Sequence, residues 1–130
     1  MKNTVAVTVT SLLSILLLTI HLADDIVRGF EKGNVANLSA TPVVVLWLYA
    51  ALFLNERRSG LLIILVLSLL SFGMPFIHMS GRGVGAGSRI ANTSGALLFV
   101  WTLIALNVTA LLSAVLAARG LWNLRRGQPR

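Results

Sequence analysis

The residues best suited to chemistry lie near the end of the first apolar segment. The spacing i, i+3, i+4, i+7 relates His21, Asp24, Asp25 and Arg28. On an α-helix these four side chains share one face. Imidazole and carboxylate groups can bind a metal ion or hold a proton near neutral pH. The alternative is a polar helix end at a membrane surface, where Asp24 and Arg28 form an ion pair.

The same helix face continues back into the apolar segment. Thr10 and Ser14 precede His21 at helical spacing. Hydroxyl and ionisable groups are costly against lipid and tend to face protein or a water-filled cavity. We therefore expect this line of polar side chains to face the interior of the protein.

A second histidine ends the third apolar segment, and we expect it to lie at the same depth as His21. The sequence thus predicts an outer-face site formed by His21, Asp24, Asp25 and His78. Two imidazoles and two carboxylates suit zinc, iron or Cu(II), whereas Met74 would add a soft ligand for Cu(I). Two histidines from separate helices could alternatively bind one haem b.

No established catalytic or metal-binding motif supports a specific chemistry. The helical His-Glu-x-x-His, EF-hand and Glu-x-x-His patterns are missing from the sequence. There is also no cysteine, which excludes thiolate metal sites, cysteine nucleophiles and the disulfide-forming membrane families. The sequence favours a protein that is not an enzyme and leaves that question open.

A glycine-rich segment covers residues 80–89 and carries Arg82 and Arg89. Its backbone N–H groups and arginines could bind an anion such as a lipid phosphate. It neither follows a strand nor opens a helix, so the pattern does not support a nucleotide-binding loop. The alternative is an outer loop without a ligand.

The composition indicates a membrane protein. Of the 130 residues, 56% are hydrophobic and only 12% are charged, and the mean hydropathy is +0.85. A soluble domain of this size could not bury so much apolar surface. The net charge of +7 comes from basic residues that flank the apolar segments. This placement favours contact with anionic lipids over nucleic-acid binding.

Four apolar segments predict an all-α integral membrane four-helix bundle with a single domain, residues 1–130. A membrane-spanning helix needs about 20 residues. The second segment is the weakest because its uninterrupted apolar part starts only after Pro42. The connections are short, so consecutive helices should be antiparallel in an up-down-up-down topology. We expect the first segment to remain uncleaved, because cleavage after Ala23 would place His21 where a small residue is needed. The predicted spans are about 5–23, 38–54, 60–78 and 95–118.

The basic residues also predict the orientation. Seven of the eleven lie on the side of the chain termini, which the positive-inside rule places in the cytoplasm. The small size of the chain favours the inner membrane of a bacterium. The seven are Lys2, Arg57, Arg58, Arg119, Arg125, Arg126 and Arg130, against Arg28, Lys32, Arg82 and Arg89 on the other side.

The fourth apolar segment carries a small-residue seam for helix packing. Thr109, Ser113 and Ala117 recur every four residues, which permits close approach of another helix. Asn107 lies in the same segment, deep in the predicted hydrocarbon region. We expect its amide to bind a partner within the bundle or in a second protomer.

Three functions remain as alternatives. The leading one is a non-enzymatic accessory bundle; the second is a metal- or haem-binding protein that uses the outer-face site. The third is a small proton-coupled transporter that acts as a homodimer, because the length is similar to that of four-span small multidrug exporters. That family needs a carboxylate in the middle of its first span, where this chain has Leu16, Leu17 and Leu18.

Overall fold

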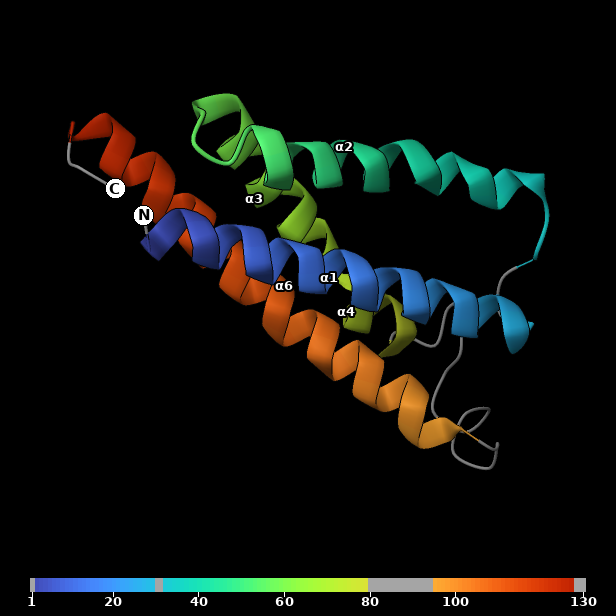
Figure 1. The fold of residues 1–130 in the computed structure, drawn as a ribbon. Helices are drawn as coiled ribbons and strands as arrows, with labels where there is room; N and C mark the ends of the chain where they lie inside the picture. Colours follow the sequence, from blue (N-terminus) through green and yellow to red (C-terminus); the bar gives the residue numbers. More distant parts are fainter. Residues whose placement is uncertain (1, 30–31, 80–94, 128–130) are drawn as a thin grey trace.

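The computed structural model describes residues 2–29, 32–79 and 95–127, and this part of the chain contains helices and no strand. The expected all-α class is confirmed for these residues. The long helices are rich in Leu and Ala, which are strong helix formers. The elements are α1 (Lys2–Val27), a 3₁₀-helix η1 (Val35–Ala40), α2 (Thr41–Phe53), α3 (Arg58–Phe72), α4 (Met74–Met79) and α6 (Ala96–Arg125) (Figure 1).

Three helices are long and apolar enough to cross a membrane. They cover Asn3–Val27, Ala96–Arg125 and Arg58–Phe76, and the last of these stretches combines α3 with the first residues of α4. The segment predicted over 38–54 contains a helix of 13 residues, which is below this length. Pro42 lies in its first turn, where the missing N–H of proline is tolerated. The 3₁₀-helix η1 leads into α2 without an interruption.

The third predicted span is divided into two helices at Gly73. Pro75 has no N–H and cannot continue the α-helical hydrogen bonding, and the N–H of Phe76 donates to the carbonyl of Gly73 at 3.1 Å. The carbonyl of Phe72 accepts a hydrogen bond of 2.9 Å from the side-chain amide of Asn107 on α6. Asn107 therefore has the partner within the protein that its position predicted.

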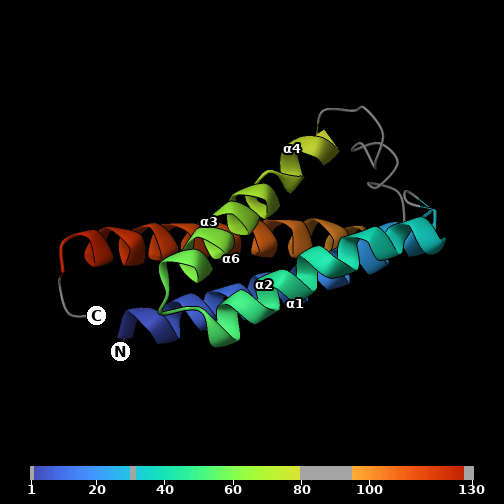
Figure 2. The ribbon, with the colours of Figure 1, turned by 90° about the horizontal axis from the view of Figure 1, so that it is seen from above.

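Consecutive long segments run in opposite directions, and α1 lies antiparallel beside α6 (Figure 1). The helix α3 crosses α6 obliquely, and α4 continues away from α1 and α2 (Figure 2). The beginning of α1 and the end of α6 lie at the same end of the molecule. There the Asn3 amide approaches the carbonyl of Leu116 at 3.5 Å. The α2–α3 turn is at this end too, because Asn55 donates a 2.7 Å hydrogen bond to the hydroxyl of Thr8.

The turn between α2 and α3 requires glycine at position 60. A Cβ atom at Gly60 would lie 2.0 Å from the carbonyl oxygen of Leu54. This overlap involves backbone rather than a flexible side chain, so neither group can move without displacing the turn. Gly60 thus allows α3 to start directly beside the end of α2.

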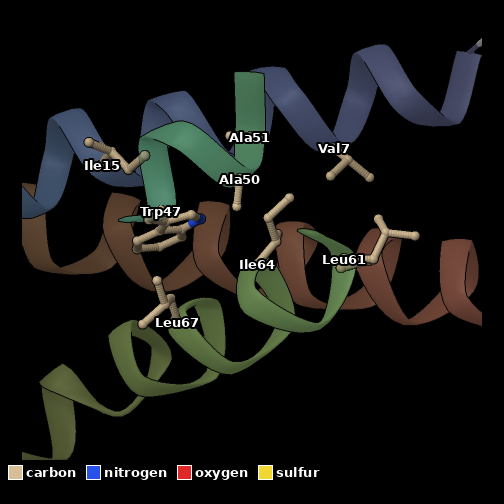
Figure 3. Close-up of a cluster of buried hydrophobic side chains, with 9 residues drawn as sticks. Val7, Ile15, Trp47, Ala50, Ala51, Leu61, Ile64 and Leu67 are labelled. Carbon is tan, nitrogen blue, oxygen red and sulfur yellow. The ribbon is translucent and has the colours of Figure 1, made fainter. Parts of the chain in front are cut away.

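Polar side chains occupy much of the interior, and large apolar side chains cover the surface. One apolar cluster packs around Trp47, which is 1% exposed (Figure 3). By contrast, Leu16, Leu70 and Trp101 are more than half exposed. Exposure of so many large apolar side chains is unusual in soluble proteins and suits helices surrounded by lipid. The buried polar residues are Ser11, Ser14, His21, Asp25, Ser68, Ser71, Thr102 and Ser113.

Candidate functional site

The α1–α6 interface positions the predicted polar face of α1. Ser14 and His21 are fully buried, so these members of the polar line face the interior as expected. Ser11 also lies on this face, and its hydroxyl oxygen is 2.8 Å from that of Ser113 on α6. The interface therefore combines small side chains with hydrogen bonds between helices, a mode of packing typical of membrane proteins.

His21 is held by side chains from α6. Its Nδ1 atom lies 3.2 Å from the hydroxyl oxygen of Thr102. The centre of its ring lies 4.8 Å from the centre of the Phe99 ring. The Thr102 hydroxyl is also 2.9 Å from the carbonyl oxygen of Leu98. A hydroxyl has one proton, so donation to that carbonyl leaves a lone pair to accept from Nδ1–H. The contacts therefore favour a proton on Nδ1, with Nε2 on the side of Asp25.

Asp25 lies one helical turn after His21 and is 3% exposed. Its Oδ2 atom is 3.9 Å from Nε2 of His21. A proton on Nε2 would make this contact an ion pair, because the imidazole would then be charged. The arrangement places one nitrogen and one carboxylate oxygen together in the interior, where both could bind one metal ion.

Arg28 connects the end of α1 to the beginning of α6. Its Nε donates to Oδ2 of Asp24 at 2.7 Å, which confirms the ion pair expected from the spacing. Its Nη2 donates to the carbonyl of Gly95 at 2.7 Å, and its guanidinium carbon lies 5.6 Å from the centre of the Phe99 ring. Asp24 is thus engaged by Arg28, whereas Asp25 is beside His21.

Known proteins offer no guide to the chemistry of this cluster. No family model, curated protein or solved structure matches the chain. The function must therefore be inferred from the geometry of the side chains themselves.

The structure describes only some of the remaining predicted ligands. Met74 begins α4 and lines an apolar cavity of about 370 Å³ together with Leu18 and Leu22 of α1. The side chain of His78 lies outside the described residues, as do Arg82 and Arg89. Within the described part of the chain, no group of three or more His, Cys, Asp or Glu residues could hold a metal ion. The contribution of His78 to a metal site therefore stays a prediction, and so does the anion site of the glycine-rich segment.

The seam predicted on α6 is divided between two environments. Ser113 and Ala117 are fully buried, and Ser113 faces Ser11 of α1. Thr109 is half-buried, and its hydroxyl donates within its own helix to the carbonyl of Ala105 at 2.9 Å. Among these three residues, Ser113 makes the hydrogen bond between helices.

A second polar contact between helices involves residues that sequence reasoning missed. The Thr8 hydroxyl donates to the carbonyl of Ala51 at 3.1 Å, and Asn55 donates to both the Thr8 hydroxyl and this carbonyl. These bonds attach α1 to the end of α2. Thr8 and Ser11 lie three residues apart and provided a signal, since they add hydroxyl side chains to α1 besides those of Thr10 and Ser14.

Proposed function

We propose that this chain is an integral membrane protein whose four helical segments cross the bilayer, and that it acts without catalysis as an accessory bundle for a larger membrane complex. The observation that carries the proposal is that its interior polar groups form contacts between helices. The pairs Ser11–Ser113, His21–Thr102 and Asn107–Phe72 each join two helices. Such contacts stabilise helix packing in lipid.

The second span is supported when η1 and α2 are taken together. The six residues of η1 extend about 12 Å at about 2.0 Å per residue, and the 13 residues of α2 extend about 20 Å at about 1.5 Å per residue. Their combined length of about 32 Å is comparable to a hydrocarbon core of about 30 Å. The segment 35–53 therefore suits a fourth crossing with little tilt.

The outer surface of α6 is suited to contact with lipid or a partner helix. Leu97, Trp101 and Val108 are each at least half exposed. A protein that supports a larger complex needs such a surface, whereas its internal hydrogen bonds keep its own helices together. We therefore expect the chain to occur in a heteromeric membrane complex with a fixed stoichiometry.

The test is the size of the native assembly. Membranes from the source organism, with a tagged chain at its natural level, would be solubilised in mild detergent and separated by native electrophoresis. We expect a discrete assembly larger than a homodimer, with a co-purifying protein in constant ratio. The control is the same chain produced alone in another host, which should migrate as a smaller species. Identical migration in both hosts would refute the accessory role.

A metal site at the outer end is the second candidate, favoured by the contact between His21 and Asp25. Metal–nitrogen and metal–oxygen bonds of zinc-type sites are each about 2.0–2.2 Å long, so one ion could bridge atoms 3.9 Å apart. Elemental analysis of gently solubilised protein tests this. Stoichiometric zinc, iron or copper should be lost in His21→Ala and Asp25→Asn and retained in Asp24→Asn. Metal-free wild-type protein would exclude this candidate.

A further inference from the structure

A groove with two arginines opens between α3 and α6, at the end of the molecule where α1 begins and α6 ends. It has a volume of about 320 Å³. Arg58 comes from the first turn of α3, and Arg125 comes from the last turn of α6. Deeper along the same two helices, Leu62, Leu121 and Ala118 line the groove. One end of the groove is therefore cationic and the rest is apolar.

The charged end of the groove is available to a ligand. Arg58 and Arg125 are exposed, and among the residues that the structure describes neither forms an ion pair with a carboxylate. Trp122 also lines the groove, and the guanidinium carbon of Arg126 lies 4.6 Å from the centre of its ring. Tryptophan is enriched at the level of lipid headgroups. The arginines thus lie where the phosphates of one leaflet should be.

We propose that this groove binds an anionic glycerophospholipid of the leaflet at the end of the molecule where α1 begins and α6 ends. The phosphate would be bound between Arg58 and Arg125, since guanidinium groups form paired hydrogen bonds with phosphate oxygens. One acyl chain would lie against Leu62 and Leu121. The apolar depth of the groove favours a lipid over a soluble anion, because a soluble anion would leave these side chains without a partner. The inference rests on the membrane insertion in the proposed function, but it does not depend on the accessory role.

Native mass spectrometry of the full chain in a neutral detergent tests the proposal directly. The probe is dioleoyl phosphatidylglycerol, with dioleoyl phosphatidylcholine for comparison. We expect one tightly bound phosphatidylglycerol per chain and at least roughly tenfold weaker binding in the double variant Arg58→Gln, Arg125→Gln. The matched control is Arg57→Gln, Arg119→Gln, which removes the same charge from exposed residues at the same end. This control should weaken binding by less than about threefold.

A second variant tests the apolar part of the groove without changing its charge. Ala118→Phe should fill the groove and reduce phosphatidylglycerol binding, while helix content measured by circular dichroism stays unchanged. Equal losses in the two double variants would overturn the proposal and indicate a non-specific effect of net charge. Displacement of the lipid by millimolar glycerol 3-phosphate would overturn it in favour of a soluble phosphate ligand. Either result would leave the native-complex test unaffected, so failure of this site can be distinguished from failure of the accessory role.

Discussion

His21 connects the two longest helices through contacts of different kinds. Its ring packs against Phe99 and its Nδ1 contacts the Thr102 hydroxyl, both on α6, whereas its Nε2 is near Asp25 on its own helix. Burying a polar side chain costs free energy unless its hydrogen-bonding groups have partners. The contribution of His21 to stability therefore depends on α6 as much as on α1.

We predict that His21→Ala lowers the free energy of unfolding by about 2–4 kcal/mol. The substitution leaves a cavity beside Phe99 and removes the contact between Nδ1 and the Thr102 hydroxyl. Thermal unfolding in detergent, followed by circular dichroism, would measure the loss. Leu16→Ala is the control, because Leu16 is 55% exposed on the same helix. Similar losses in the two variants would contradict the assigned role of His21.

At the scale of the helices, the α1–α6 pair keeps one antiparallel register along its length. Ser11 meets Ser113 near the middle of α1, and His21 meets Thr102 further along. Arg28 reaches the carbonyl of Gly95, at the start of α6. Polar contacts at three levels restrict sliding and rotation, because a shift by one residue would break all of them.

Cysteine cross-linking tests this register cleanly, because the natural chain has no cysteine. The Ser11→Cys, Ser113→Cys variant should form an intramolecular disulfide, since the two hydroxyl oxygens are 2.8 Å apart and disulfides require close Cβ atoms. With a protease site introduced within residues 80–94, the two fragments should separate on gels only after reduction. Leu13→Cys, Ser113→Cys is the control and should not cross-link, because Leu13 is 44% exposed on another face of α1.

The close approach of α2 and α3 gives a second prediction for the helices. Gly60→Ala should lower the free energy of unfolding by about 1–3 kcal/mol or more, because the new methyl group overlaps the Leu54 carbonyl. Gly120→Ala is the matched control. There the nearest atoms are the flexible Cδ atoms of Leu61 at 3.0 and 3.2 Å, and alanine favours the helix. Denaturant titration measures the free energy of unfolding of both variants. Equal losses in Gly60→Ala and Gly120→Ala would contradict this prediction.

The sequence predicted the helices better than the boundaries between them. Continuous apolar length was sufficient to locate α1, α3 and α6. The break at Gly73 was not predicted, because the apolar pattern continues through it and the effect of Pro75 depends on neighbouring helices. The fourth predicted span was placed over 95–118, whereas α6 continues to Arg125, because arginine is a good helix former and does not interrupt a helix.

The candidate site was predictable where it depended on one helix. The spacing of His21 and Asp25 placed both on the buried face of α1, and the ion pair between Asp24 and Arg28 followed from the same rule. The Ser11–Ser113 pair could not be predicted, because it depends on the register between α1 and α6. Helical periodicity defines a face, but it does not determine which residues of another helix lie opposite.

At the scale of the whole molecule, basic residues gather at one end. The start of α1, the α2–α3 turn and the end of α6 lie together there (Figure 1). This end includes Arg57, Arg58 and Arg125, whereas Arg28 and Lys32 belong to the other end. Since basic residues flanking membrane segments are retained on the cytoplasmic side, the shared end should be cytoplasmic.

We therefore predict that both termini are cytoplasmic and that the connection between α1 and η1 is outside the cytoplasm. Alkaline phosphatase should be active when it is fused after Lys32 and inactive when it is fused after Arg126. A fluorescent protein should give the opposite pattern, because it matures in the cytoplasm. It should fluoresce when it is fused after Arg126 and not when it is fused after Lys32. Enzyme activity after Arg126 would contradict the charge argument, as would equal activity at both positions. The headgroups beside Arg58 and Arg125 would then belong to the opposite leaflet, and the lipid groove would face a different lipid composition.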